Sequence, residues 1–202
     1  MKASSVPTTL QQIFDDWLLE VKKDLHKRGQ FWTPTLVTRP AESRTVVLRR
    51  LAAPEAESSV NQAPNLPLFV IHTDTRSKKW AQLQQAPNCG LHFYCAKRKW
   101  QMRVDGLAAL HAQDANAEAE WQALSERSQK IYALKHRPGE QVDDPEKAYC
   151  FDDAAQAYKH FGVISIRATH LESLQLERPD RTNFHIRAAW AVETQTLNYL
   201  AP

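Results

Sequence analysis

Three short segments of the sequence combine cations, hydroxyls and amides with apolar residues at spacings that suit ligand binding. They are residues 44–50 (RTVVLRR), 73–80 (TDTRSKKW) and 100–106 (WQMRVDG). Each segment pairs fixed positive charge with a β-type apolar stretch or with the start of a helix. Together they predict a site for a phosphate and for a flat ring with polar edges.

Residues 73–80 have the features of a helix start that binds an anion. Thr73 and Ser77 are residue types that favour helix caps. Lys78 and Lys79 fall in the first helical turn, where the helix dipole does not favour cations. An anion at this place would explain them, since free backbone N–H groups at a helix N-terminus also point toward it. The alternative is a solvated basic face at a helix end.

The other two segments have the alternation of β-strands. In a regular strand Arg44 and Val46 share one face, whereas Val47 and Arg49 share the other. One of the two arginines must therefore act from a strand end, or main-chain groups must contact the ring. Gln101 and Arg103 lie on one face of the third segment, where an amide can match a ring edge that has both donors and acceptors. The alternatives are solvated charges beside a core strand and an exposed cross-strand polar pair.

Periodicity predicts one long helix followed by many strands. The helix spans residues 9–27, with Thr8 and Gln11 as a capping box, and we expect its apolar stripe to pack on the sheet. Strands are expected at residues 31–37, 45–51, 68–72, 89–96, 100–110, 161–168, 182–193 and 194–200. Helices are also expected at residues 76–86, 115–130 and 153–158, with turns or loops at 39–43, 52–67, 97–99 and 136–149. Many antiparallel strands with few helices favour a mainly β (α+β) fold, a β-barrel with helical additions.

The composition fits a globular protein. The chain has 202 residues, of which 43% are hydrophobic, and a formal charge of +3, which suits a small anionic ligand better than nucleic acid. Cys89, Cys95 and Cys150 form no C-x-x-C motif, so neither a disulfide framework nor a zinc site is expected. No apolar run approaches a membrane span and the first residues have no signal-peptide core, so we expect a cytoplasmic protein.

In this order the three segments resemble the flavin-binding segments of the pyridoxamine 5'-phosphate oxidase family, the FMN-binding split barrels. The strand 44–49 resembles the strand that lines the flavin, Ser77-Lys78-Lys79 resembles a Ser-Arg-Lys triplet that holds the FMN phosphate, and Gln101 resembles a glutamine that contacts the ring. The resemblance implies an antiparallel split β-barrel with flanking helices, a single domain over residues 1–202, and a homodimer with FMN at the interface. It implies no metal and identifies no catalytic side chain. The residues expected to bind FMN are Arg44, Val46, Val47, Arg49, His72, Thr73, Ser77, Lys78, Lys79, Gln101, Arg103, Gln141 and Arg181.

The sequence departs from the family pattern at three places. Lys78 stands where the family has an arginine, which keeps the charge but loses the bidentate fork. Trp100 stands where an arginine usually precedes the glutamine. The family's Arg-Leu-His-Asp-Arg-like run is not reproduced between residues 174 and 187. Since that run closes on the substrate, these differences argue against pyridoxamine phosphate as the substrate.

The resemblance implies an FMN-dependent oxidoreductase that acts on a small molecule, with the substrate unassigned. One alternative is a non-catalytic FMN carrier or sensor, or a haem-handling split barrel, for which His72, His92 and His185 would be the candidate axial ligands. Another is a basic barrel that binds nucleic acid through exposed tryptophans. The helical spacing of Trp17 and Trp80 favours their burial instead.

Overall fold

The computed structural model describes residues 9–53, 66–176 and 184–202. The predicted loop at residues 52–67 and the strand start at 182–183 lie largely outside these ranges. The helices are α1 (Leu10–Lys27), α2 (Lys78–Gln85), α3 (Ala115–Gln122), α4 (Glu126–Lys130) and α5 (Ala154–His160). Short 3-10 helices are Gln30–Trp32, Ile131–Ala133 and Pro145–Tyr149. The strands are β1 (Thr35–Thr38), β2 (Glu42–Thr45), β3 (Leu48–Ala52), β4 (Leu68–Asp74), β5 (Asn88–Cys95), β6 (Trp100–His111), β7 (Phe161–Gln175), β8 (Ile186–Ala191) and β9 (Thr196–Leu200).

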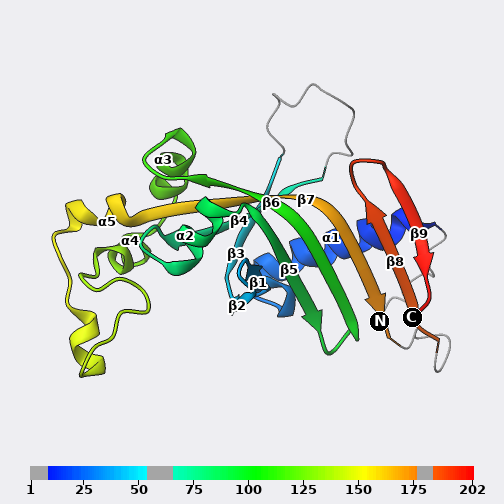
Figure 1. Cartoon of the computed structure of the whole chain (residues 1–202), viewed down its shortest axis with the longest axis horizontal. Coiled ribbons are helices and arrows are strands. Elements are labelled where there is room, and N and C mark those ends of the chain that lie inside the picture. The colour runs from blue at the N-terminus through cyan, green and yellow to red at the C-terminus, as the bar shows by residue number, and fades with distance from the viewer. Residues whose placement is uncertain (1–8, 54–65, 177–183) are drawn as a thin grey trace.

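The strands form one curled antiparallel sheet, a split β-barrel, as expected. Its order is β2-β1-β5-β6-β7-β4-β3, and β8 pairs with the far end of β7 and with β9. The long strands β6 and β7 form the spine of the molecule (Figure 1), and β5 joins β6 through the predicted hairpin. Because side chains alternate along β6, Trp100, Met102 and Val104 are buried while Arg103 is exposed.

Helix α1 covers the inner face of the sheet and closes the main core. It begins at Thr9, whose side chain accepts a hydrogen bond from the Gln12 backbone N–H, and not at the predicted Thr8 box. Its apolar stripe buries Phe14 and Trp17 completely, and the Trp17 ring meets Phe93 of β5 edge-on at 5.2 Å between centroids. The helix and its packing on the barrel are therefore confirmed.

A second, smaller core lies at the other end of β7. There α3, α4 and α5 form an arm beside the barrel (Figure 1), and Tyr132, Ala117 and Phe161 are buried in it. Trp17, Trp80, Trp100 and Trp190 are all at most 7% exposed, so the burial expected for Trp17 and Trp80 is confirmed. No helix in the described part of the chain is long and apolar enough to cross a membrane.

Three predicted elements are wrong in detail, and each has a local cause. The strand 45–51 is broken between β2 and β3, because the Val46 N–H bonds the Pro34 carbonyl at 2.9 Å while β2 pairs with β1 and β3 pairs with β4. The strand 31–37 begins as a 3-10 turn, closed by the Trp32 N–H on the Gly29 carbonyl. The helix 115–130 is interrupted at residues 123–125, because Ser125 caps a new helix by accepting from the Ser128 N–H.

Candidate functional site

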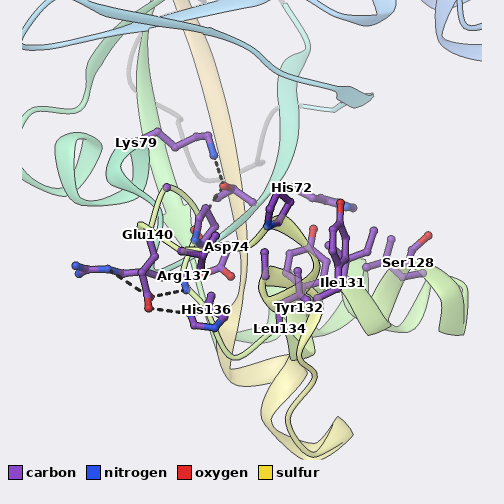
Figure 2. A pocket seen from close by; sticks show the side chains of 18 of the residues that line it. His72, Asp74, Lys79, Ser128, Ile131, Tyr132, Leu134, His136, Arg137 and Glu140 are labelled. Atoms are coloured by element: carbon purple, nitrogen blue, oxygen red, sulfur yellow. Dashed lines mark hydrogen bonds and ion pairs between the residues drawn. The ribbon is translucent and has the colours of Figure 1, made fainter.

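A cavity lies at the point where β4 loses one neighbouring strand. Pairing of β4 with β3 ends at Ile71, whereas pairing with β7 continues to Asp74. The freed edge of residues 72–74 faces this cavity of about 710 Å³, around which side chains of β4, α2 and the arm converge (Figure 2). Because side chains alternate, His72 points to one face of β4 and Thr73 to the other.

On the Thr73 face, Lys79 is a half-buried ammonium group without a counterion. Its Nζ donates to Thr73 Oγ1 at 2.8 Å, and within the described residues it forms no ion pair with a carboxylate. Burial, aided by the nearby charge of Arg44, lowers the pKa of Lys79. Ser77 precedes α2 but makes no side-chain capping bond; its Oγ lies 3.3 Å from Thr73 Oγ1. This face therefore presents a cation, two hydroxyls and a helix N-terminus, which together suit an anion.

Beside Lys79, two further cations share one carboxylate. Arg44 donates to Glu42 at 3.1 Å, to Thr38 Oγ1 at 2.6 Å and to Gln82 Oε1 at 3.0 Å. Lys78 also pairs with Glu42, and its side chain is 72% exposed. Neither cation lines the cavity. The predicted triplet is thus divided, with Lys79 directed to the cavity and Lys78 to the surface.

On the opposite face of β4, His72 is held by Glu120 of α3. His72 Nε2 lies 2.9 Å from Glu120 Oε2, and Glu120 also accepts from Arg50. Burial raises the pKa of Glu120, but the hydrogen bonds from Arg50 and His72 outweigh it, so the net pKa is lowered. Burial lowers the pKa of His72 more than Glu120 raises it. A neutral imidazole that donates from Nε2 to an ionised carboxylate follows, with Nδ1 buried and unpaired among the described residues.

The same face carries Arg49 and Tyr132. Arg49 lines the cavity and forms no ion pair within the described ranges. The Tyr132 ring is 9% exposed and packs against Phe161, at 5.0 Å between centroids, and His72 packs on the same ring at 5.1 Å. Burial raises the pKa of Tyr132 to about 12, opposed by the charge of Arg49. Arg49, His72 and Tyr132 therefore form one group, the Arg49 group.

Sequence reasoning missed Tyr132 and Glu120 as members of the site. Neither belongs to a recognisable motif. Tyr132 lines the cavity and Glu120 contacts His72 only because the arm folds back beside β4. Glu120 falls within the predicted helix 115–130 and Tyr132 follows it closely, so no local signal marked either residue as part of the site.

Three further residues expected to bind the cofactor, Val46, Val47 and Gln141, do not line the cavity. Val46 is buried and Val47 half-buried in the break between β2 and β3. Gln141 is exposed between the cavity-lining Glu140 and Val142. Arg181 lies outside the described residues. Of the expected set, the cavity brings together Arg49, His72, Thr73 and Lys79, with Ser77 beneath them.

Gln101 and Arg103 are remote from the cavity within one chain. His72 pairs with Val163 on β7, whereas Gln101 pairs with Leu174. These β7 positions are eleven residues apart, or about 36 Å of strand at 3.3 Å per residue. On the outer face there, Glu172 pairs with both Arg103 and Arg187, so the two arginines are fixed by one nearly buried carboxylate.

Comparison with known proteins agrees with the fold. The family model described as pyridoxamine 5'-phosphate oxidase, FMN-binding domain, matches residues 11–112. A solved structure of a pyridoxamine 5'-phosphate oxidase-related, FMN binding protein from Nostoc punctiforme PCC 73102 is similar, with a TM-score of 0.67 and 17% identity over 98% of this chain and 100% of that one. PhzG from Burkholderia lata 383, in complex with tetrahydrophenazine-1-carboxylic acid, has a TM-score of 0.64 and 16% identity over 98% of this chain and 95% of that one. No curated protein matches the chain.

Proposed function

The chain belongs to the family of the pyridoxamine 5'-phosphate oxidase FMN-binding domain, and on this premise we propose that it binds FMN at the open edge of β4 and acts as an FMN-dependent oxidoreductase. The observation that carries the proposal is Lys79, a half-buried cation that the fold leaves without a carboxylate partner in its described part. Burying an unpaired charge is costly, so a site that retains one is suited to an anionic ligand.

The residues at this edge fit the phosphate of FMN. Thr73 and Ser77 offer hydroxyl groups, Lys79 offers an ammonium group, and the N-terminus of α2 adds its partial positive charge. Arg44 and Lys78 increase the positive potential from behind, although Glu42 offsets one of their charges. We expect Lys79 and Thr73 to contact the phosphate directly and Arg44 to act mainly through its charge.

The ring of FMN needs contacts that one chain does not place at the cavity. Gln101 and Arg103 lie on the outer face of the sheet, where Tyr94 is 47% and Val37 38% exposed. We propose that this face packs against a second copy, so that Gln101 and Arg103 of each protomer reach the cavity of the other. The exposed apolar side chains would then be covered, as dimer interfaces require.

The proposed reaction is electron transfer to or from a small molecule. FMN supplies the redox chemistry of its isoalloxazine ring when bound, so the protein need only bind, orient and shield the reactants. The wall of the cavity contributed by the arm favours an enzyme over a simple FMN carrier, because it leaves space beside the cofactor for a second molecule. A haem-binding role for His72 is disfavoured, because Glu120 engages its Nε2 and its side chain is only 4% exposed.

Two measurements test the proposal. Titration of the purified protein with FMN, followed by quenching of flavin fluorescence, should show saturable binding with one FMN per chain, and sedimentation should show a dimer. Anaerobic mixing of the loaded protein with NADH or NADPH should then bleach the flavin absorption. Absence of FMN binding would overturn the proposal, while binding without any reduction by donors would leave only a carrier.

A further inference from the structure

The free edge of β4 separates two groups of polar side chains that differ in charge. On the Thr73 face, Arg44, Lys78 and Lys79 stand against the single carboxylate of Glu42. This leaves an excess of two positive charges, which matches a dianionic phosphate monoester. Under the proposed function, the phosphate of FMN neutralises the excess positive charge of this face.

The Arg49 group on the other face has an excess of one positive charge. His72 is neutral, because burial lowers its pKa, and Glu120 is balanced by Arg50. Asp74, on the same face, is balanced by Arg76 at 2.7 Å. Arg49 therefore remains as the one uncompensated charge of this group within the described chain. A monoanion matches it, whereas a dianion would carry one unpaired charge into a partly apolar site.

Tyr132 supplies a hydrogen-bonding group beside Arg49. The residue as a whole is 9% exposed, and its hydroxyl is not one of the buried side-chain atoms that lack a hydrogen-bond partner. The side chain lines the cavity. A neutral phenol can donate a hydrogen bond to one oxygen of a carboxylate, while the neighbouring guanidinium forms an ion pair with the same carboxylate.

Much of the rest of this face is apolar. Side chains from the segments on either side of α4 line the cavity there, namely Leu124, Ile131, Leu134, Val142 and Tyr149. The polar lining residues of the same region are Ser128, His136, Arg137 and Glu140, of which Arg137 and Glu140 pair with each other. Ile131 and Tyr149 are 62% and 70% exposed, so their side chains are accessible to a ring bound in the cavity.

We infer that Arg49 and Tyr132 form a substrate subsite for a small aromatic monocarboxylate, whose ring lies on the apolar wall of the arm. The inference rests on the proposed function only in assigning the Thr73 face to FMN. It adds a substrate class and gives Tyr132 the role of a specificity-determining residue. His72, fixed by Glu120, lies beside the same group and contributes no competing charge.

The experiment uses four probes by calorimetry, with FMN-saturated and with FMN-free protein. Benzoate carries both the ring and the charge, benzamide has the ring without charge, acetate has the charge without the ring, and phenyl phosphate is a dianion. Benzoate should bind at least about tenfold more tightly than each of the other three, since a charged hydrogen bond and the ring each contribute about that factor. Tighter binding of phenyl phosphate, or equal binding of benzamide, would overturn the inference.

Variants identify the residues responsible. Tyr132→Phe keeps the ring that packs on Phe161 and should weaken benzoate about tenfold while benzamide changes little. Tyr199→Phe, the same substitution at a 61% exposed position on β9, is the matched control and should leave benzoate binding intact. Arg49→Gln should abolish the preference for benzoate over benzamide. Unaltered benzoate affinity in Tyr132→Phe would refute the assignment.

The two proposals fail in different ways. Loss of FMN binding with retained benzoate selectivity would contradict the proposed function and support the subsite, because Arg49 and Tyr132 are present without the cofactor. FMN binding without benzoate selectivity would support the proposed function and overturn the subsite.

Discussion

Lys79 and Lys78 are neighbours in sequence that the structure assigns to different surroundings, and this difference predicts their effects on FMN affinity. Lys79 Nζ lies 2.8 Å from Thr73 Oγ1 at the cavity, whereas Lys78 pairs with Glu42 at an exposed position. Replacing Lys79 by Gln removes a charge-assisted hydrogen bond to the phosphate, worth about 1.5–3 kcal/mol. The dissociation constant for FMN should therefore rise about 10- to 100-fold.

The matched substitution is Lys78→Gln, which removes the same charge one residue away. Because that ammonium group is solvated and already paired, its loss should raise the dissociation constant by at most about threefold. Both variants are measured by fluorescence quenching of FMN at one salt concentration, since exposed charges are screened more than buried ones.

The stability of the cofactor-free protein supplies a second readout. Burial lowers the pKa of Lys79, which means that the folded state disfavours its charge at neutral pH. Lys79→Gln should therefore unfold at the same or a higher temperature than the unmodified chain while it binds FMN more weakly. Equal effects of the two substitutions on FMN affinity, or a loss of stability in Lys79→Gln, would refute the assignment of Lys79 to the phosphate.

Three further outcomes follow from the packing and the charges. Gly162→Ala should lower the free energy of unfolding by about 2 kcal/mol in thermal melts, because its new Cβ would lie 2.5 Å from the Trp80 ring; an unchanged melting temperature would contradict this packing. Asp24→Asn should cost about 2 kcal/mol at pH 7, since it breaks the pair with Arg98. Burial raises the pKa of Asp24, but the hydrogen bonds from Arg98 and from the Phe31 N–H lower it by more, so the net pKa lies below the ordinary value of 3.8. The ionised Asp24 therefore stabilises the fold at pH values above 3.8, and this contribution is lost as the pH falls through the lower pKa of the folded state. Denaturant titrations from about pH 5 to 2 should accordingly show a flatter pH dependence in Asp24→Asn, and an equal slope would contradict the pairing. Glu42→Gln should lower the dissociation constant for FMN a few-fold, because it removes the carboxylate beside the phosphate site. A higher dissociation constant would contradict this and show that Glu42 holds Arg44 and Lys78 in place for binding.

Local patterns predict those elements whose causes are local. The helix α1 follows from apolar residues at helical spacing, and the β5–β6 hairpin follows from two alternating stretches around residues 97–99. The division of residues 42–52 into β2 and β3 could not be predicted in this way, because its cause is the carbonyl of Pro34 and the choice of two different partner strands. That break also removes the parity conflict between Arg44 and Arg49, since the two arginines lie on separate strands.

The candidate site was predictable only in part, for the same reason. The run of capping residues and lysines at residues 73–79 indicates an anion site, but not that Lys79 reaches the cavity while Lys78 turns toward Glu42. Tyr132 and Glu120 join the site because α3 and the segment after α4 pack beside the end of β7. Glu120 and Tyr132 lie about fifty and sixty residues after His72 in the sequence. Their approach to His72 is therefore a tertiary contact, which no local spacing encodes.

A crystal structure of the protein grown with FMN tests the central claim most directly. The account predicts that the phosphate lies at the open edge of β4, within hydrogen-bond distance of Lys79 Nζ and Thr73 Oγ1, while the Arg49 group remains accessible to a second molecule. FMN bound elsewhere, or its phosphate held by groups other than Lys79 and Thr73, would contradict it.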